Sequence, residues 1–90
     1  MQWSQDQAIA FECAREAITE LMALRSGEIS HESSLSEPNE ARLDDLRADR
    51  ARLGRERAAL HVGQDAQVAR IRADYGILLR ASAADRPLVL

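Results

Sequence analysis

The fold of this 90-residue chain depends on the short stretch Val62-Gly63-Gln64-Asp65. Before it, leucines recur at spacings of three, seven and seven, a heptad pattern typical of one packed face of a helix: Leu43, Leu46, Leu53 and Leu60. After it, the apolar pattern continues in a different phase: Val68, Ile71, Tyr75 and Leu78. A change of phase indicates either a stutter within one long helix or a break between two helices.

Two all-α architectures fit this pattern. Gly63 could end one helix and Asp65 could favour the start of the next, which gives a three-helix bundle broken within 62–65. Without the break, residues 38–83 form a rod of about 68 Å, at about 1.5 Å per residue, in an antiparallel hairpin with the first helix. We favour the hairpin with the long second helix, in which a break near Gly63 stays open as an option, because an isolated glycine inside a helix costs only about 1 kcal/mol.

The first helix is expected over about residues 4–30. Ser4 can accept a hydrogen bond from the backbone of Gln7 while the Gln7 side chain reaches back to Ser4, which is a capping box, with Trp3 and Ala8 placed as a hydrophobic staple. At about 100° per residue, the larger apolar residues and alanines share one face. These are Ala10, Phe11, Ala14, Ala17, Ile18, Leu21, Met22 and Leu24.

The remaining segments complete a single domain over 1–90. A loop rich in serine is predicted at about 31–37, with Ser36 as the cap of the following helix and Pro38 in its first turn. The tail at 84–90 contains Pro87 and then the apolar residues Leu88 and Leu90. We interpret it as a tail folded onto the end of the bundle, or else as a docking peptide.

Composition places the chain among cytoplasmic proteins without a membrane span. Its single cysteine, Cys13, suits a reducing compartment, and the unbroken apolar runs are only a few residues long. No basic stretch followed by an apolar run marks a secretory signal. Its acidic neighbours Glu12 and Glu16 do not favour a reactive thiolate, so Cys13 is predicted to be a small buried residue.

Nothing in the residue spacing points to catalysis, to a metal or to a cofactor. His31 and His61 are the only histidines, and neither stands at a zinc-ligand spacing from another ligand. The four glycines are isolated, so no phosphate-binding loop is present. The ladder Glu12, Glu16 and Glu20 is interpreted as a solvated face rather than as a cation site. We therefore expect neither an enzyme nor a cofactor.

Arginines gather in the second helical segment, where they raise the alternative of a nucleic-acid-associated regulator acting through residues 42–57. Four acidic residues are interleaved with them and the isoelectric point is about 5.3, so nucleic acid is the less favoured partner. Arg50 and Arg57 fall on the leucine seam itself. We expect both to lie against carboxylates across a helix interface; the alternative is that they extend their head groups into solvent.

The favoured function is a non-catalytic protein-binding module: a small helical adaptor, regulator or inhibitor that occupies a surface of a partner protein whose identity the residues do not specify. Its predicted partner-binding residues combine exposed apolar groups, the acidic ladder and the seam arginines: Ile9, Glu12, Glu16, Glu20, Arg50, Arg57, Leu88 and Leu90. A homodimer is also predicted, because a chain of this size has a thin core and a long second helix would overhang the first.

Overall fold

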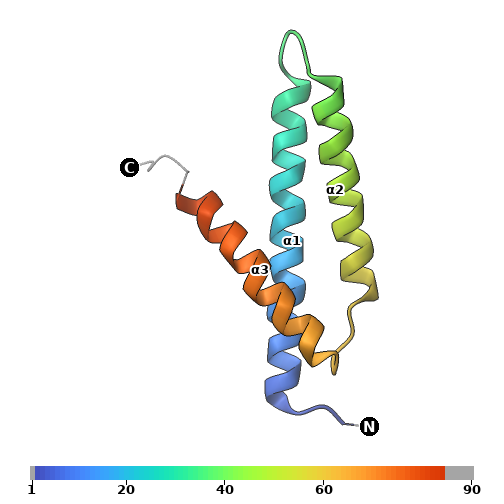
Figure 1. Ribbon diagram of the computed structural model, residues 1–90, viewed down its shortest axis with the longest axis vertical. Coiled ribbons are helices and arrows are strands. Elements are labelled where there is room, and N and C mark those ends of the chain that lie inside the picture. Colours follow the sequence, from blue (N-terminus) through green and yellow to red (C-terminus); the bar gives the residue numbers. More distant parts are fainter. Residues whose placement is uncertain (1, 85–90) are drawn as a thin grey trace.

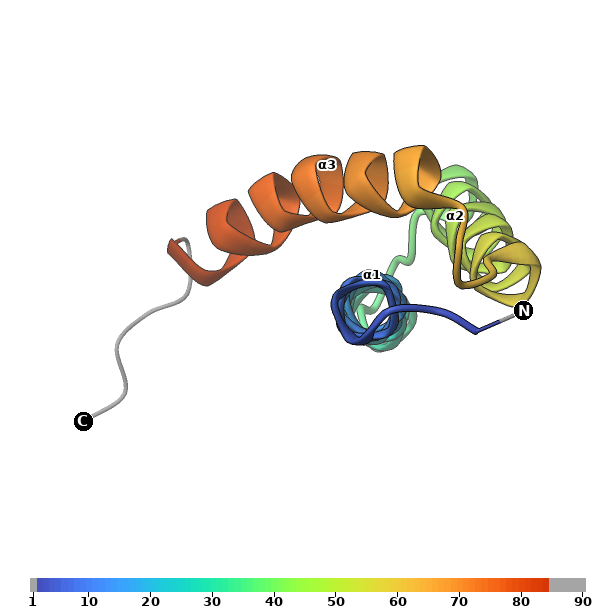
Figure 2. The same ribbon diagram turned by 90° about the horizontal axis from the view of Figure 1, so that it is seen from below.

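The computed structural model describes residues 2–84, and within this range the chain forms three helices (Figure 1). Helix α1 spans Gln5–Ser33, α2 spans Glu40–Ala59 and α3 spans Asp65–Ala84. Both α2 and α3 pack against α1 and not against each other. Viewed from below, α2 and α3 lie over one side of α1, which makes a two-layer molecule of 54 × 33 × 16 Å (Figure 2). The all-α prediction is confirmed.

The second helical segment is broken at Gly63, so the structure has the break that the sequence left open there, and the unbroken rod over residues 38–83 is wrong. Helix α2 ends at Ala59, and Gly63 has a φ of +96°, a left-handed conformation that side-chain-bearing residues rarely adopt. A Cβ atom at Gly63 would clash with the ring of Trp3, which lies against this turn. The physical reason for the error is that we treated Gly63 only as a helix residue, whereas a turn of positive φ packed under Trp3 requires a glycine.

The beginning of α1 has the predicted capping box and is also joined to α3. The backbone N–H of Ser4 donates to Gln7 Oε1 at 2.9 Å, and the backbone N–H of Gln7 donates to Ser4 Oγ at 3.0 Å, completing the capping box. The side-chain amide of Gln7 also donates to both carboxylate oxygens of Asp65 at 3.3 Å. Together with Trp3 on Gly63, this contact fixes the start of α3 beside the first turn of α1.

The connection between α1 and α2 begins later than predicted, because α1 continues to Ser33 and the cap of α2 is Asn39 rather than Ser36. The Asn39 side chain accepts a hydrogen bond from the backbone of Arg42 at 3.1 Å. Glu32, buried in the last turn of α1, accepts a hydrogen bond from the backbone N–H of Asn39 at 3.0 Å. This carboxylate holds the capping residue in place at the start of α2.

The core lies where α2 and α3 meet α1 near its middle. Its buried members come from one face of α1, from the leucine seam of residues 43–60 and from α3: Ala14, Ile18, Leu21, Leu53, Leu60, Val68, Ile71 and Tyr75. Leu43 and Leu46 are buried nearer the α1–α2 turn, which confirms the leucine seam. Leu78, expected on the α3 seam, is 48% exposed, and Leu79 packs against the core in its place, because α3 moves away from α1 at this point.

Polar side chains link α2 to both of its neighbours. Arg25 of α1 donates to the Asp49 carboxylate at 2.7 Å, and this hydrogen bond lowers the pKa of Asp49 against the opposing effect of desolvation. The Tyr75 hydroxyl of α3 donates to the Glu56 carboxylate, which also accepts a hydrogen bond from Arg70 at 3.0 Å. Helix α3 therefore touches α2 through polar side chains rather than through packed backbones.

Candidate partner-binding groove

A groove of about 750 Å³ opens where the C-terminal half of α3 diverges from α1. Its apolar lining comes from both helices, with Ala23 and Leu24 on α1 and Leu79 and Ala83 on α3. The rest of the lining is polar: Glu20, Glu28, His31 and Glu32 of α1 and Arg42 of α2. The groove is an apolar surface with charged margins, which is the usual construction of a site that receives another polypeptide.

Small, exposed residues on α1 line part of the groove. Gly27 lines it, and a Cβ atom built there would meet nothing within 4 Å, so the space reaches the helix backbone itself. Ala23, one turn earlier, adds only a methyl group. On the other wall, α3 carries a run of four residues without a polar side chain, Gly76 to Leu79. A helix with apolar residues around most of its circumference calls for cover on more than one side.

The margins of the groove differ in charge. Glu28 is neutralised by Arg25 at 2.5 Å and by Arg42 at 3.3 Å, and Glu32 is paired with Arg42 at 3.4 Å. Glu20 is exposed, and within residues 2–84 it makes neither an ion pair nor a side-chain hydrogen bond. Uncompensated negative charge is therefore concentrated at the Glu20 end of the groove.

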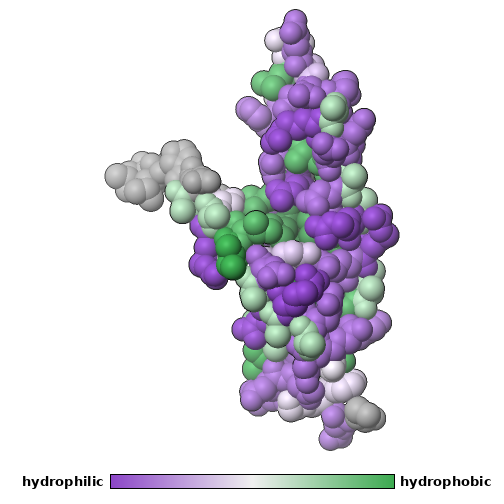
Figure 3. All heavy atoms as spheres, in the orientation of Figure 1, coloured by the Kyte–Doolittle hydropathy of each residue, from purple (hydrophilic) through white to green (hydrophobic). Residues whose placement is uncertain are grey.

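Large apolar side chains are also exposed on the C-terminal half of α3 outside the lining of the groove. Ile77 is 60% exposed and Leu78 is 48% exposed. Figure 3 shows hydrophobic residues gathered over the C-terminal half of α3, at the place where it parts from α1, with hydrophilic residues covering most of the surrounding surface. Exposed apolar patches of this kind, bounded by polar residues, typically mark interaction surfaces.

The structure distributes the predicted partner-binding residues over separate surfaces. Ile9, Glu12, Glu16 and Glu20 are all exposed along the outer side of α1, and of these four only Glu20 lines the groove. Leu88 and Leu90 lie outside the described residues. Sequence reasoning missed the groove residues of α1 and α3, although the small residues at positions 23 and 27 beside an apolar α3 were a usable signal.

Arg50 and Arg57 do cross the α1–α2 interface, but the prediction that carboxylates oppose them is wrong. Arg50 Nε donates to Ser26 Oγ at 2.7 Å, and Arg57 Nη1 donates to Thr19 Oγ1 at 3.0 Å. The carboxylates at this interface pair with other arginines, Asp49 with Arg25 and Glu28 with Arg42. The helix register thus leaves hydroxyl groups facing the seam arginines.

The arginines of residues 42–57 do not form a one-sided basic stripe. Arg42, Arg47 and Arg52 pair with carboxylates, and Arg50 and Arg57 bind hydroxyl groups. Arg55 is the one member of this group for which residues 2–84 supply no such partner. Binding to a phosphate backbone needs unpaired positive charge along one face, so this arrangement adds no support to the nucleic-acid alternative.

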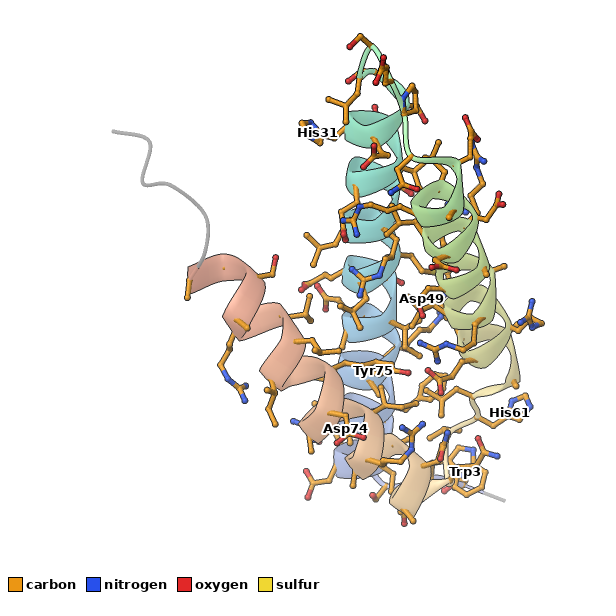
Figure 4. All side chains as sticks on the ribbon, turned by 45° about the horizontal axis from the view of Figure 1, so that its top comes forward. Trp3, His31, Asp49, His61, Asp74 and Tyr75 are labelled. Carbon is orange, nitrogen blue, oxygen red and sulfur yellow. The ribbon has the colours of Figure 1, made fainter. Side chains whose placement is uncertain are left out.

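Groups able to carry out chemistry are dispersed. Cys13 is exposed rather than buried, because it lies on the side of α1 that faces away from α2 and α3. Figure 4 places His31 near the end of α1 and His61 at the α2–α3 connection, at opposite ends of the molecule. Among the described residues, no three histidine, cysteine or acidic side chains come together as a metal site would require, and no buried side-chain nitrogen or oxygen lacks a hydrogen-bond partner.

Comparisons with protein-family models, curated proteins and solved structures give no match to this chain. Between residues 2 and 84, no helix combines the length and the hydrophobicity that crossing a bilayer demands.

Proposed function

We propose that this protein is a non-catalytic binding module that receives one amphipathic helix of a partner protein in the groove between α1 and α3. The observation that carries this proposal is the open apolar groove of about 750 Å³ whose one uncompensated margin is acidic. By covering the apolar face of a partner's helix, the protein would act as an adaptor, a regulator or an inhibitor. Its single cysteine supports the cytoplasmic location that we propose with it.

The lining of the groove specifies the chemistry of the partner. Helices bound in grooves present apolar side chains at positions i, i+3 or i+4, and i+7, and small residues beneath them allow close approach. Ala23 and Gly27 supply that close approach, while Leu24 and Leu79 supply apolar contacts. Glu20 favours a lysine or arginine on the flank of the incoming helix. The expected partner is therefore a basic amphipathic helix.

The test uses synthetic peptides as defined probes. A leucine–lysine peptide of about 18 residues, with leucines at helical spacing, is compared with a scrambled peptide of the same composition. We expect the full chain to bind the amphipathic peptide in fluorescence anisotropy and to bind the scrambled one at least about tenfold more weakly. Equal binding of the two peptides would mean attraction by net charge alone and would contradict the proposal.

A matched pair of variants locates the binding. Gly27→Phe fills the groove, since the space above Gly27 is open, and should weaken peptide binding at least about tenfold. Gly27→Ala has the same backbone effect without filling the groove and should bind as the unaltered chain does. Glu20→Arg should also weaken binding, whereas Glu12→Arg, on the same helix but outside the groove, should change it much less. If Gly27→Phe binds normally, the groove is not the site.

A further inference from the structure

Helix α3 has a second apolar face, opposite the one that packs on α1. Its members recur at spacings of four, four and three, and at about 100° per residue they fall within an arc of about 80°. They are Ala73, Ile77, Ala81 and Ala84. All four are exposed, although Ile71 and Tyr75 on the other side of the same helix are buried. Nothing within residues 2–84 covers this face.

Charged residues stand symmetrically about the centre of this face. Asp74 lies three residues before Ile77, and Arg80 lies three residues after it. When two copies of such a helix pair antiparallel about a twofold axis at Ile77, each Asp74 meets Arg80 of the other copy. Each chain therefore supplies one partner to each of two equivalent ion pairs. A parallel arrangement would instead place Asp74 beside Asp74 and Arg80 beside Arg80.

Both charged groups are available for these pairs. The carboxylate of Asp74, 57% exposed, has one contact in the described chain, an ion pair with Arg70 at 3.5 Å along the same helix. The guanidinium of Arg80 lies along its own helix beside Gly76, 3.1 Å from the position that a Cβ atom would take there. Within residues 2–84, Arg80 makes no ion pair. An exposed pair within one helix contributes little, so exchanging it across a dimer has a low cost.

We infer that the protein forms a homodimer through this outer face of α3, with the two α3 helices antiparallel and their Ile77 side chains in contact at the twofold axis. The alanines on either side of Ile77 let the helices approach closely, as small residues do at helix interfaces. The overhanging long helix, from which the sequence predicted a dimer, does not exist. The inference rests instead on the outer face of α3, and it is independent of the groove, which Gly27 and Leu79 line from another side.

The first experiment combines measurement of mass with charge exchange. Sedimentation equilibrium of the full chain should detect a particle of twice the 10.0 kDa chain mass. Asp74→Arg and Arg80→Asp should each weaken the dimer at least about tenfold, because each places like charges opposite each other, and the double variant should restore it. Ile77→Arg should also disrupt the dimer, whereas Ile9→Arg, at a similarly exposed isoleucine of α1, should leave it intact.

The second experiment tests the register directly. In a Cys13→Ser background, Ile77→Cys should cross-link two chains on mild oxidation, because a twofold axis at position 77 brings the two Cβ atoms together. Ile9→Cys in the same background serves as the control and should cross-link poorly. A chain that stays at its monomer mass at all concentrations overturns the inference. So does a dimer that survives both single charge changes and does not cross-link at position 77.

Discussion

The two interfaces of α1 are of different kinds. Against α2, leucines from Leu43 to Leu60 pack along the whole length of the shorter helix, and ion pairs such as Arg25–Asp49 close its edge. Against α3, apolar packing ends after Tyr75 and Leu79. Within the described residues, the side-chain hydrogen bonds between these two helices are those from Gln7 to the two carboxylate oxygens of Asp65. The first interface ends in charged residues, whereas the second ends in apolar ones.

The surface left for partners on this protein lies on α3 rather than on α2. The outer side of α2 is charged, so covering the leucine seam leaves no large apolar side chain of α2 exposed. Helix α3 remains apolar past its last contact with α1, and Ile77 and Leu78 are among the large apolar side chains left exposed. The groove and the outer face both exist because α3 carries more apolar side chains than the rest of the described chain covers.

The largest expected effects come from removing the central side chain of each interface. Leu53 of α2 is 1% exposed at the interface with α1, and Ile71 of α3 is 0% exposed. Leu53→Ala and Ile71→Ala should each lower the free energy of unfolding by about 2 to 5 kcal/mol, measured by urea denaturation. Hydrogen exchange should separate them, because Ile71→Ala should release the amides of α3 while the α1–α2 hairpin keeps its protection.

If Ile71→Ala instead loses hydrogen-exchange protection equally in all three helices, the two interfaces form one cooperative unit and are not of different kinds. Ile71→Val, which removes a single methylene, serves as the milder control and should cost about 0.5 to 1.5 kcal/mol.

Much of the fold could be read from the sequence because helix signals are local. The capping box at Ser4, the apolar face of α1 and the leucine seam depend on spacing alone, and the structure has all three. The break at Gly63 depends on Trp3, sixty residues earlier, and the capping of α2 depends on Glu32. Contacts of that range have no periodicity, so the sequence could offer two architectures and not choose correctly between them.

The candidate groove was harder to predict for a related reason. It exists because α3 diverges from α1, and a crossing angle cannot be read from the periodicity of either helix. Glu20 was expected among the partner-binding residues on account of its exposure, but Gly27 and Leu79 acquire their role only from the geometry. The seam arginines show the same limit, since their position was predicted and their hydroxyl partners were not.

A smaller effect should come from the polar contact between α2 and α3. The Tyr75 hydroxyl donates to Glu56 and lies 3.4 Å from the Arg52 guanidinium. Tyr75→Phe keeps the buried ring and removes this link, so it should cost about 1 to 2 kcal/mol in urea denaturation. A double-mutant cycle with Glu56→Gln should show coupling between the two positions. If the two losses add without coupling, the hydroxyl does not hold α3 to α2.

The smallest effect is expected at the seam arginines Arg50 and Arg57, because their hydrogen-bond partners are neutral hydroxyl groups. Arg57 donates to a hydroxyl of exposed Thr19, and Arg50 donates to Ser26, so after either arginine is removed water can satisfy the hydroxyl group. Arg57→Leu and Arg50→Leu exchange one neutral-partner hydrogen bond for apolar burial along the leucine seam. The two contributions nearly cancel, and the free energy of unfolding should change by less than about 0.5 kcal/mol.

Arg25→Leu is the matched control, because Arg25 faces the carboxylates of Asp49 and Glu28 across and along the same interface. Its removal takes away one of the two arginines that each carboxylate contacts, leaving Arg52 to Asp49 and Arg42 to Glu28, so it should cost about 1 kcal/mol. Urea denaturation of the three variants at neutral pH makes the comparison. If Arg57→Leu and Arg50→Leu lose as much stability as Arg25→Leu, the seam arginines fix the register of α2 on α1. If only Arg25→Leu loses stability, that register depends on the ion pairs at the edge of the interface.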